Sequence, residues 1–140
     1  MLSDRDQELV SAAGDAIKRR YRNDWQEVGA ALRTRSGKIF TGVNLDAYLG
    51  RMAVCAEAVA LGRAVVEIGD AGIDTIVAVR HPPPGEKDQT IAVVSPCGAC
   101  RELIFDYDAK ARVIVPNGGA AAVVNIGELL PNKYSRGSEG

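Results

Sequence analysis

Three cysteines and one glutamate have the types and spacing to form a metal site. Cys97 and Cys100 are separated by two residues in Ser-Pro-Cys-Gly-Ala-Cys, and Cys55 stands two positions before Glu57. Three thiolates on Zn²⁺ leave the fourth tetrahedral position to water, which is the arrangement of a catalytic zinc site. Such a site makes water nucleophilic near neutral pH, and Glu57 follows Cys55 closely enough to move the proton. The pattern therefore favours hydrolysis at an open zinc site.

Two other interpretations of the cysteines stay open at the level of sequence. Cys-Gly-Ala-Cys after a strand is also typical of a thioredoxin-like redox pair, although that function leaves Cys55 and Glu57 without a role. A closed structural zinc site needs a fourth protein ligand. His81, the only histidine of the chain, is the candidate for that ligand, although an exposed loop position is the simpler interpretation.

The elements that must position these residues follow from the hydrophobic periodicity and the turn signals. We expect helices over residues 2–21, 55–68 and 98–107, and a short helix in 126–131. We expect two strands joined by a turn at 35–37, further strands over 73–79, 91–94, 111–115 and 121–125, and a proline-rich loop over 81–90. This order predicts a three-layer α/β/α domain. The cysteines fall at strand-to-helix junctions, where ligands collect in such folds.

Length and composition indicate one globular domain over residues 1–140, with a tail beyond about Tyr134 that we expect to be frayed. The net charge is −1 and no block of like charges occurs, so a nucleic-acid partner is disfavoured and a small ligand is expected. We expect no membrane span and no secretory signal. The odd number of cysteines favours free thiols in a reducing cytoplasm.

The zinc-dependent nucleobase deaminases carry the pattern H-x-E…P-C-x-x-C, in which cysteine can replace the histidine. Here the pattern is Cys-Ala-Glu at 55–57 and Pro-Cys-Gly-Ala-Cys at 96–100. The chain therefore resembles the cytidine deaminase family. Further segments resemble that family in the same order and extend the likeness over most of the chain: VGAAL (28–32), FTGVN (40–44), SPCGACREL (95–103) and ELLPNKY (128–134).

The resemblance implies a mixed five-stranded sheet and one Zn²⁺ per subunit, held by Cys55, Cys97 and Cys100. It also implies a homotetramer, with a homodimer as the alternative. Glu57 would take a proton from water, pass it to N3 of a cytosine ring and then protonate the departing amine. The implied reaction converts a free cytidine-like nucleoside and water to the uridine form and ammonia, as in pyrimidine salvage.

The resemblance also suggests substrate contacts. Asn44 and Asp46 match an Asn-x-Glu ribose clamp with a shortened acid, and Ala56 lies between the first cysteine and the glutamate. Trp25 stands one position before the place at which the family has the aromatic residue that flanks the base. Tyr134 matches a family aromatic residue that reaches a neighbouring subunit. A structural role is the alternative for each: Asn44 as a loop cap, Trp25 as a core or lid residue, and Tyr134 as packing.

Some positions depart from ordinary cytidine deaminases. Ala58 follows Glu57, where three-cysteine members often carry arginine; this alanine and the ELLPNKY ending resemble blasticidin S deaminase. The alternative substrate is therefore blasticidin S or another aminated nucleoside or base. A non-catalytic or nucleic-acid-directed module is the alternative of another class, against which Glu57 and the neutral charge both count. For Arg101, support of the Cys100 thiolate and a solvent-facing position both stay open.

Overall fold

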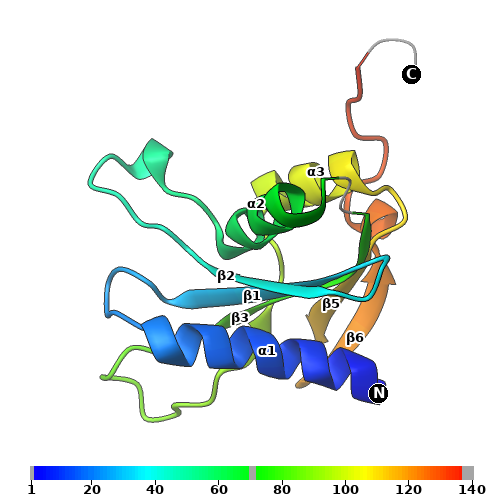
Figure 1. Ribbon diagram of the computed structural model, residues 1–140. Coiled ribbons are helices and arrows are strands. Elements are labelled where there is room, and N and C mark those ends of the chain that lie inside the picture. Colours follow the sequence, from blue (N-terminus) through cyan, green and yellow to red (C-terminus); the bar gives the residue numbers. More distant parts are fainter. Residues whose placement is uncertain (1, 70–71, 137–140) are drawn as a thin grey trace.

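The computed structural model describes residues 2–69 and 72–136, and it has the three layers that the sequence predicts. Helix α1 (Asp4–Arg20) covers one face of the sheet, while α2 (Ala56–Ile68) and α3 (Gly98–Tyr107) cover the other (Figure 1). The α/β/α class is thereby confirmed. Among the helices described here, none combines the length and the apolar character needed to cross a membrane.

The sheet is mixed and contains six strands, which corrects the five-stranded sheet implied by the resemblance. Five strands form the continuous order β2 (Ile39–Val43), β1 (Val28–Thr34), β3 (Ile73–Arg80), β5 (Arg112–Asn117) and β6 (Ala120–Asn125). Only β3 and β5 among these neighbours run parallel. The sixth strand, β4 (Ala92–Val94), pairs with the end of β3. Strand β3 is long enough for its first half to pair with β5 and its last residues with β4.

The predicted element boundaries hold to within a few residues, and the differences have local causes. Helix α1 begins at Asp4 because the Ser3 hydroxyl accepts a hydrogen bond from the Asp6 N–H at 3.1 Å, which makes Ser3 the N-cap. The connection between the predicted strands 111–115 and 121–125 is shorter than expected, because β5 continues to Asn117 and only Gly118 and Gly119 turn, both with positive φ. The expected C-terminal helix is a 3₁₀ helix, η2 (Ile126–Leu129). Residues 137–140 of the tail expected to be frayed lie outside the described residues.

Two apolar cores lie on opposite faces of the sheet, and alternation along β3 separates them. Ile76 and Ala78 pack in the core under α2 and α3, whereas Val77 and Val79 pack under α1. The first core also contains Cys100 at the N-terminal end of α3. The candidate chemistry therefore lies on the α2 and α3 side of the sheet.

Gly42 on β2 allows α2 to approach the sheet closely. A Cβ atom at this position would lie 2.6 Å from the backbone nitrogen of Ala60 and 2.8 Å from the backbone oxygen of Ala56. Any side chain would therefore force the helix backbone away. The glycine places the N-terminal turn of α2, with Cys55 and Glu57, directly against the sheet.

Candidate metal centre and active site

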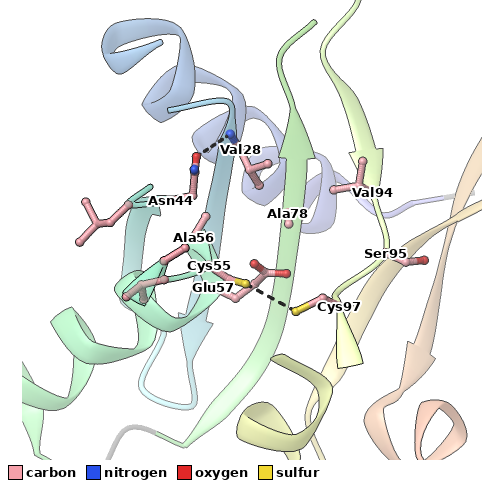
Figure 2. A pocket seen from close by; sticks show the side chains of 12 residues that line it. Val28, Asn44, Cys55, Ala56, Glu57, Ala78, Val94, Ser95 and Cys97 are labelled. Carbon is pink, nitrogen blue, oxygen red and sulfur yellow. Dashed lines mark hydrogen bonds between the residues drawn. The ribbon is translucent and has the colours of Figure 1, made fainter. Parts of the chain in front are cut away.

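The three cysteines meet where α2 and α3 begin. Cys55 is the N-cap residue of α2, Cys97 is the N-cap residue of α3, and Cys100 lies in the first turn of α3. Their sulfur atoms all lie within 4.8 Å of one another, and the Sγ atoms of Cys55 and Cys97 are 3.5 Å apart (Figure 2). Three thiols from two distant parts of the chain therefore share one small space.

This arrangement fits a zinc ion. Tetrahedral Zn²⁺ with Zn–S bonds of about 2.3 Å needs sulfur atoms about 3.8 Å apart, which is within the spacing that the three thiols already have. Thiolates are also the soft ligands that favour zinc over magnesium or calcium. The group within 4.8 Å consists of three cysteines, without a fourth His, Cys, Asp or Glu from the residues described. The donor set is thus that of an open site.

The local field favours a thiolate at Cys97. Burial acts to raise the pKa of Cys97, but the hydrogen bond from the Cys100 N–H and the bonds from neighbouring thiols outweigh it and lower that pKa. Burial raises the pKa values of Cys55 and Cys100, and the Glu57 charge adds to the rise at Cys100. Helix N-termini and a bound divalent cation both favour the thiolate form. Metal binding would therefore release protons from the thiols.

Glu57 lies in the first turn of α2 and is 6% exposed. Its carboxylate lies beside the Cys55 sulfur and points into the cavity that both residues line (Figure 2). Burial raises the pKa of Glu57, which brings this carboxyl closer to the range in which it can both accept and donate a proton at neutral pH. A buried carboxyl with a raised pKa beside a metal-binding cluster is a candidate general acid and base.

The cavity has a volume of about 300 Å³ and opens beside the cysteine cluster. Most of its wall is apolar, and the polar or ionisable lining consists of Asn44, Glu57, Ser95 and the thiols of Cys55 and Cys97. None of the described residues that line it is Lys, Arg or His. A phosphate group would therefore find no cation here, whereas a flat uncharged ring would meet mostly carbon.

Asn44 lines this cavity, and its side chain already holds the neighbouring backbone. The Oδ1 atom accepts hydrogen bonds from the N–H groups of Glu27 and Val28 at 2.8 and 3.0 Å. The Nδ2 group donates one bond to the carbonyl of Trp25 at 2.9 Å. The loop-capping role is therefore present, and the second Nδ2 hydrogen is the one left for a ligand.

Of the other predicted substrate residues, one lines the cavity and three lie outside it. Ala56 lines the cavity, but Asp46, Trp25 and Tyr134 do not. Asp46 is exposed and accepts a hydrogen bond from the N–H of Ala47, and the Trp25 ring lies 5.5 Å from that of Tyr48. Tyr134 is 80% exposed and lines a different hollow at the end of α3. In one copy of the chain these three side chains are therefore outside the cavity.

Sequence reasoning missed the apolar wall of the cavity, which includes Val28, Ala78 and Val94. Val94 carried a signal, because it stands three positions before Cys97 and must lie near it. Val28 begins the VGAAL segment, whose pattern indicates a strand but does not indicate that this side chain lines a cavity. Ala78 carried no signal, since its place depends on β3 lying between β1 and β5.

His81 lies apart from the cysteine cluster. Its ring stacks on Tyr21 with centroids 3.8 Å apart, and its Nδ1 atom lies 2.8 Å from the carbonyl oxygen of Pro82. We therefore expect the His81→Ala variant to keep its full zinc content, measured by atomic absorption on the folded protein. A closed structural site would instead make this variant lose its metal, and that loss would overturn the open-site interpretation.

Comparison with known proteins agrees with this geometry. Residues 3–116 match the sequence model of the cytidine and deoxycytidylate deaminase zinc-binding region. Over 135 residues the chain is 48% identical to a blasticidin-S deaminase from Bacillus cereus, with 96% of each protein covered. It is 32% identical over 111 residues to a cytidine deaminase from Sporosarcina psychrophila, covering 78% of this chain and 75% of that protein.

A solved cytidine deaminase from Burkholderia pseudomallei has the same fold. The TM-score is 0.73 at 29% sequence identity, and the alignment covers 95% of this chain and 100% of that one. The family match, the relatives and the fold agree with the three-cysteine cluster. The chain therefore belongs to the cytidine and deoxycytidylate deaminase zinc-binding family, and it is a hydrolase of that family.

Proposed function

We propose that this enzyme is a zinc-dependent hydrolytic deaminase of a free cytidine-like nucleoside. The observation that carries the proposal is the convergence of three cysteine sulfurs beside a buried glutamate, in a cavity without a lining cation. Cys55, Cys97 and Cys100 would hold the Zn²⁺. When bound, this ion supplies a Lewis acid that makes water nucleophilic near neutral pH.

In this proposal Glu57 moves the protons. Its ionised carboxylate takes one proton from the attacking water and delivers it to N3 of the cytosine ring. The water oxygen forms a bond to C4. Glu57 then takes the remaining proton from that oxygen and gives it to the amine, the C4–N bond breaks with release of ammonia, and a carbonyl group is left at C4. Burial, which raises the pKa of Glu57, supports this alternation because the same group must both accept and donate.

The cavity walls would orient the ring and the sugar. Val28, Ala78 and Val94 offer an apolar surface to a planar base, with Ala56 beside Glu57. The free Nδ2 hydrogen of Asn44 would donate to a sugar hydroxyl. Asp46 and Trp25 would contact a substrate only if the loops that carry them close over the cavity, and Tyr134 would do so only from a neighbouring subunit.

A second candidate substrate is blasticidin S. The observation that favours it is the 48% identity, over 96% of the chain, to a protein named blasticidin-S deaminase. Ala58 after Glu57 agrees with this assignment, because ordinary three-cysteine cytidine deaminases often have arginine there. The proposed proton transfers are the same for both substrates, since the reacting group is the amine of a cytosine ring.

A substrate panel tests the proposal. The purified zinc-loaded enzyme is assayed for ammonia release from cytidine, deoxycytidine, cytosine, deoxycytidine monophosphate and blasticidin S. We expect turnover of free nucleosides and none of the monophosphate, because no described residue that lines the cavity is cationic. Turnover of blasticidin S alone would select the second candidate. Absence of turnover on every nucleoside, with zinc bound, would contradict the proposal.

We further propose that the chain forms a homotetramer, with a homodimer as the alternative. Tyr48, Leu49 and Met52 on the loop between β2 and α2 are 98, 68 and 61% exposed, and such apolar side chains are typical of subunit contacts. Light scattering that gave a monomer at micromolar concentration would contradict this proposal. A cytoplasmic location and a role in pyrimidine salvage stay predictions.

A further inference from the structure

The turn that carries Cys97 and Cys100 is held by a residue for which the proposed mechanism has no role. Arg101 directly follows Cys100 in α3, and its side chain folds back along the helix toward the start of the turn. Its Nε group donates a hydrogen bond at 2.9 Å to the carbonyl oxygen of Pro96, the residue before Cys97. The two residues that flank the cysteine segment are thereby tied to each other.

The same guanidinium reaches a second carbonyl outside the turn. Its Nη1 group lies 3.4 Å from the carbonyl oxygen of Leu129, at the end of η2. Arg101 is half-buried, and among the residues described it forms no ion pair. Its described side-chain bonds go to backbone oxygens rather than to a sulfur atom. The arrangement therefore suits positioning of the backbone better than direct support of a thiolate.

Helix η2 is a firm support for this contact. It begins with a capping box, in which the Asn125 side chain accepts from the Gly127 N–H and the Glu128 side chain accepts from the Asn125 N–H, each at 2.9 Å. Ile126 is fully buried, and its N–H donates to the carbonyl of Ala111 beside β5. Arg101 thus connects the cysteine turn to a segment that is fixed to the sheet.

We propose that Arg101 is a positioning residue for the metal site, which holds the turn so that the sulfurs of Cys97 and Cys100 face Cys55 before a metal binds. The inference rests on the proposed zinc site. Without Arg101 the turn would become ordered only when the metal binds. The free-energy cost of that ordering would then reduce the affinity for zinc. Groups that orient metal ligands in this way typically change metal affinity by about 10–100-fold.

The test measures the rate at which the zinc-loaded enzyme and its variants release zinc to a coloured chelator. The temperature is one at which the thermal unfolding curves show that every protein is still folded. Arg101→Met removes both donors, and we expect zinc release about 10–100-fold faster than in the wild type. Arg101→Lys keeps the charge but cannot make the two-carbonyl fork, so we expect it to release zinc faster as well. Arg63→Met is the matched control, because Arg63 donates to the Thr41 carbonyl from α2, away from the cysteines. It should release zinc at the wild-type rate.

A spectroscopic readout separates positioning from general stability. The thiolate-to-Co²⁺ absorption of the cobalt-loaded enzyme reports on ligand geometry, and we expect it to change in the Arg101 variants but not in Arg63→Met. Wild-type release from folded Arg101→Met, or full rescue by lysine, would overturn the inference. If the methionine variant does not fold, the lysine variant decides alone: faster release supports the inference and wild-type release overturns it. If the wild type binds no zinc, the proposed function has failed. If the wild type binds zinc and the Arg101 variants release it at the wild-type rate, the inference about Arg101 alone has failed.

Discussion

Glu57→Gln should keep its zinc and its fold while deamination falls by about 10²–10⁴-fold, the usual range for loss of a general acid and base. Glutamine has nearly the same shape as glutamate, so the first turn of α2 and the cavity wall should be preserved. It cannot accept the proton of the attacking water or return one to the amine. The pKa of Glu57 is raised by burial, and this adjustment is lost with the carboxyl group.

The measurement is kcat on the nucleoside that the panel identifies, with zinc content determined on the same sample. The matched control is Glu67→Gln, which makes the same change at an exposed position near the end of the same helix. We expect the control to retain wild-type kcat. Wild-type turnover by Glu57→Gln with zinc bound would remove Glu57 from the mechanism and would require another proton carrier in the cavity.

The second large effect is expected at Cys97. Cys97→Ser should lose its zinc and with it essentially all deamination, because a serine hydroxyl is a much weaker zinc ligand than a thiolate. The fold should survive, since serine is a favoured N-cap residue and can accept the Cys100 N–H bond that the sulfur accepts at 3.4 Å. The variant therefore separates the metal from the helix that carries it.

Zinc stoichiometry, circular dichroism and activity together check this prediction. Ala99→Ser is the control, since it adds a hydroxyl at an exposed position between the two cysteines and leaves all three sulfurs in place. The control should bind zinc and turn over substrate like the wild type. A folded Cys97→Ser variant that still holds one zinc and has wild-type activity would contradict the prediction, because Cys97 would then not be needed as a zinc ligand.

The layers of the fold could be predicted from the sequence because their signals are local. Helix α3 has the predicted bounds, since a proline and a cysteine N-cap precede it and its apolar face has a clear period. The apolar side chains of Val77 and Val79 mark a buried strand, although alternation alone does not tell which helix covers each face. The sixth strand was predicted as an element, but its pairing depends on the length of β3, which is a tertiary property.

The residues of the proposed catalytic centre could be singled out from the sequence for a different reason: they stand in short motifs at helix starts. Cys55 and Glu57 lie within one helical turn, and Cys97 and Cys100 lie within another, so each pair is placed by local geometry. The apolar wall of the cavity was not predictable in this way, because Ala78 comes from a strand distant from both motifs. Trp25 and Asp46 lie on loops, whose paths are set by contacts such as those of Asn44 with the backbone.

The role proposed for Arg101 illustrates the same limit. The sequence allows two alternatives for Arg101, support of a thiolate or exposure to solvent. Both depend only on the helix that carries this residue. The structure adds the carbonyl of Leu129, which comes from η2, outside the helix that carries Arg101. No regular spacing in the sequence predicts a contact between a motif and a distant backbone group.

The most direct test of the account is zinc-edge X-ray absorption on the purified enzyme. We predict one zinc per chain, with three sulfur neighbours at about 2.3 Å and one oxygen neighbour at about 2.0 Å. Because the chain has only three cysteines, this result would require all of them on one ion. Fewer than three sulfur neighbours, or outer-shell scattering from an imidazole ring, would contradict the open three-cysteine site.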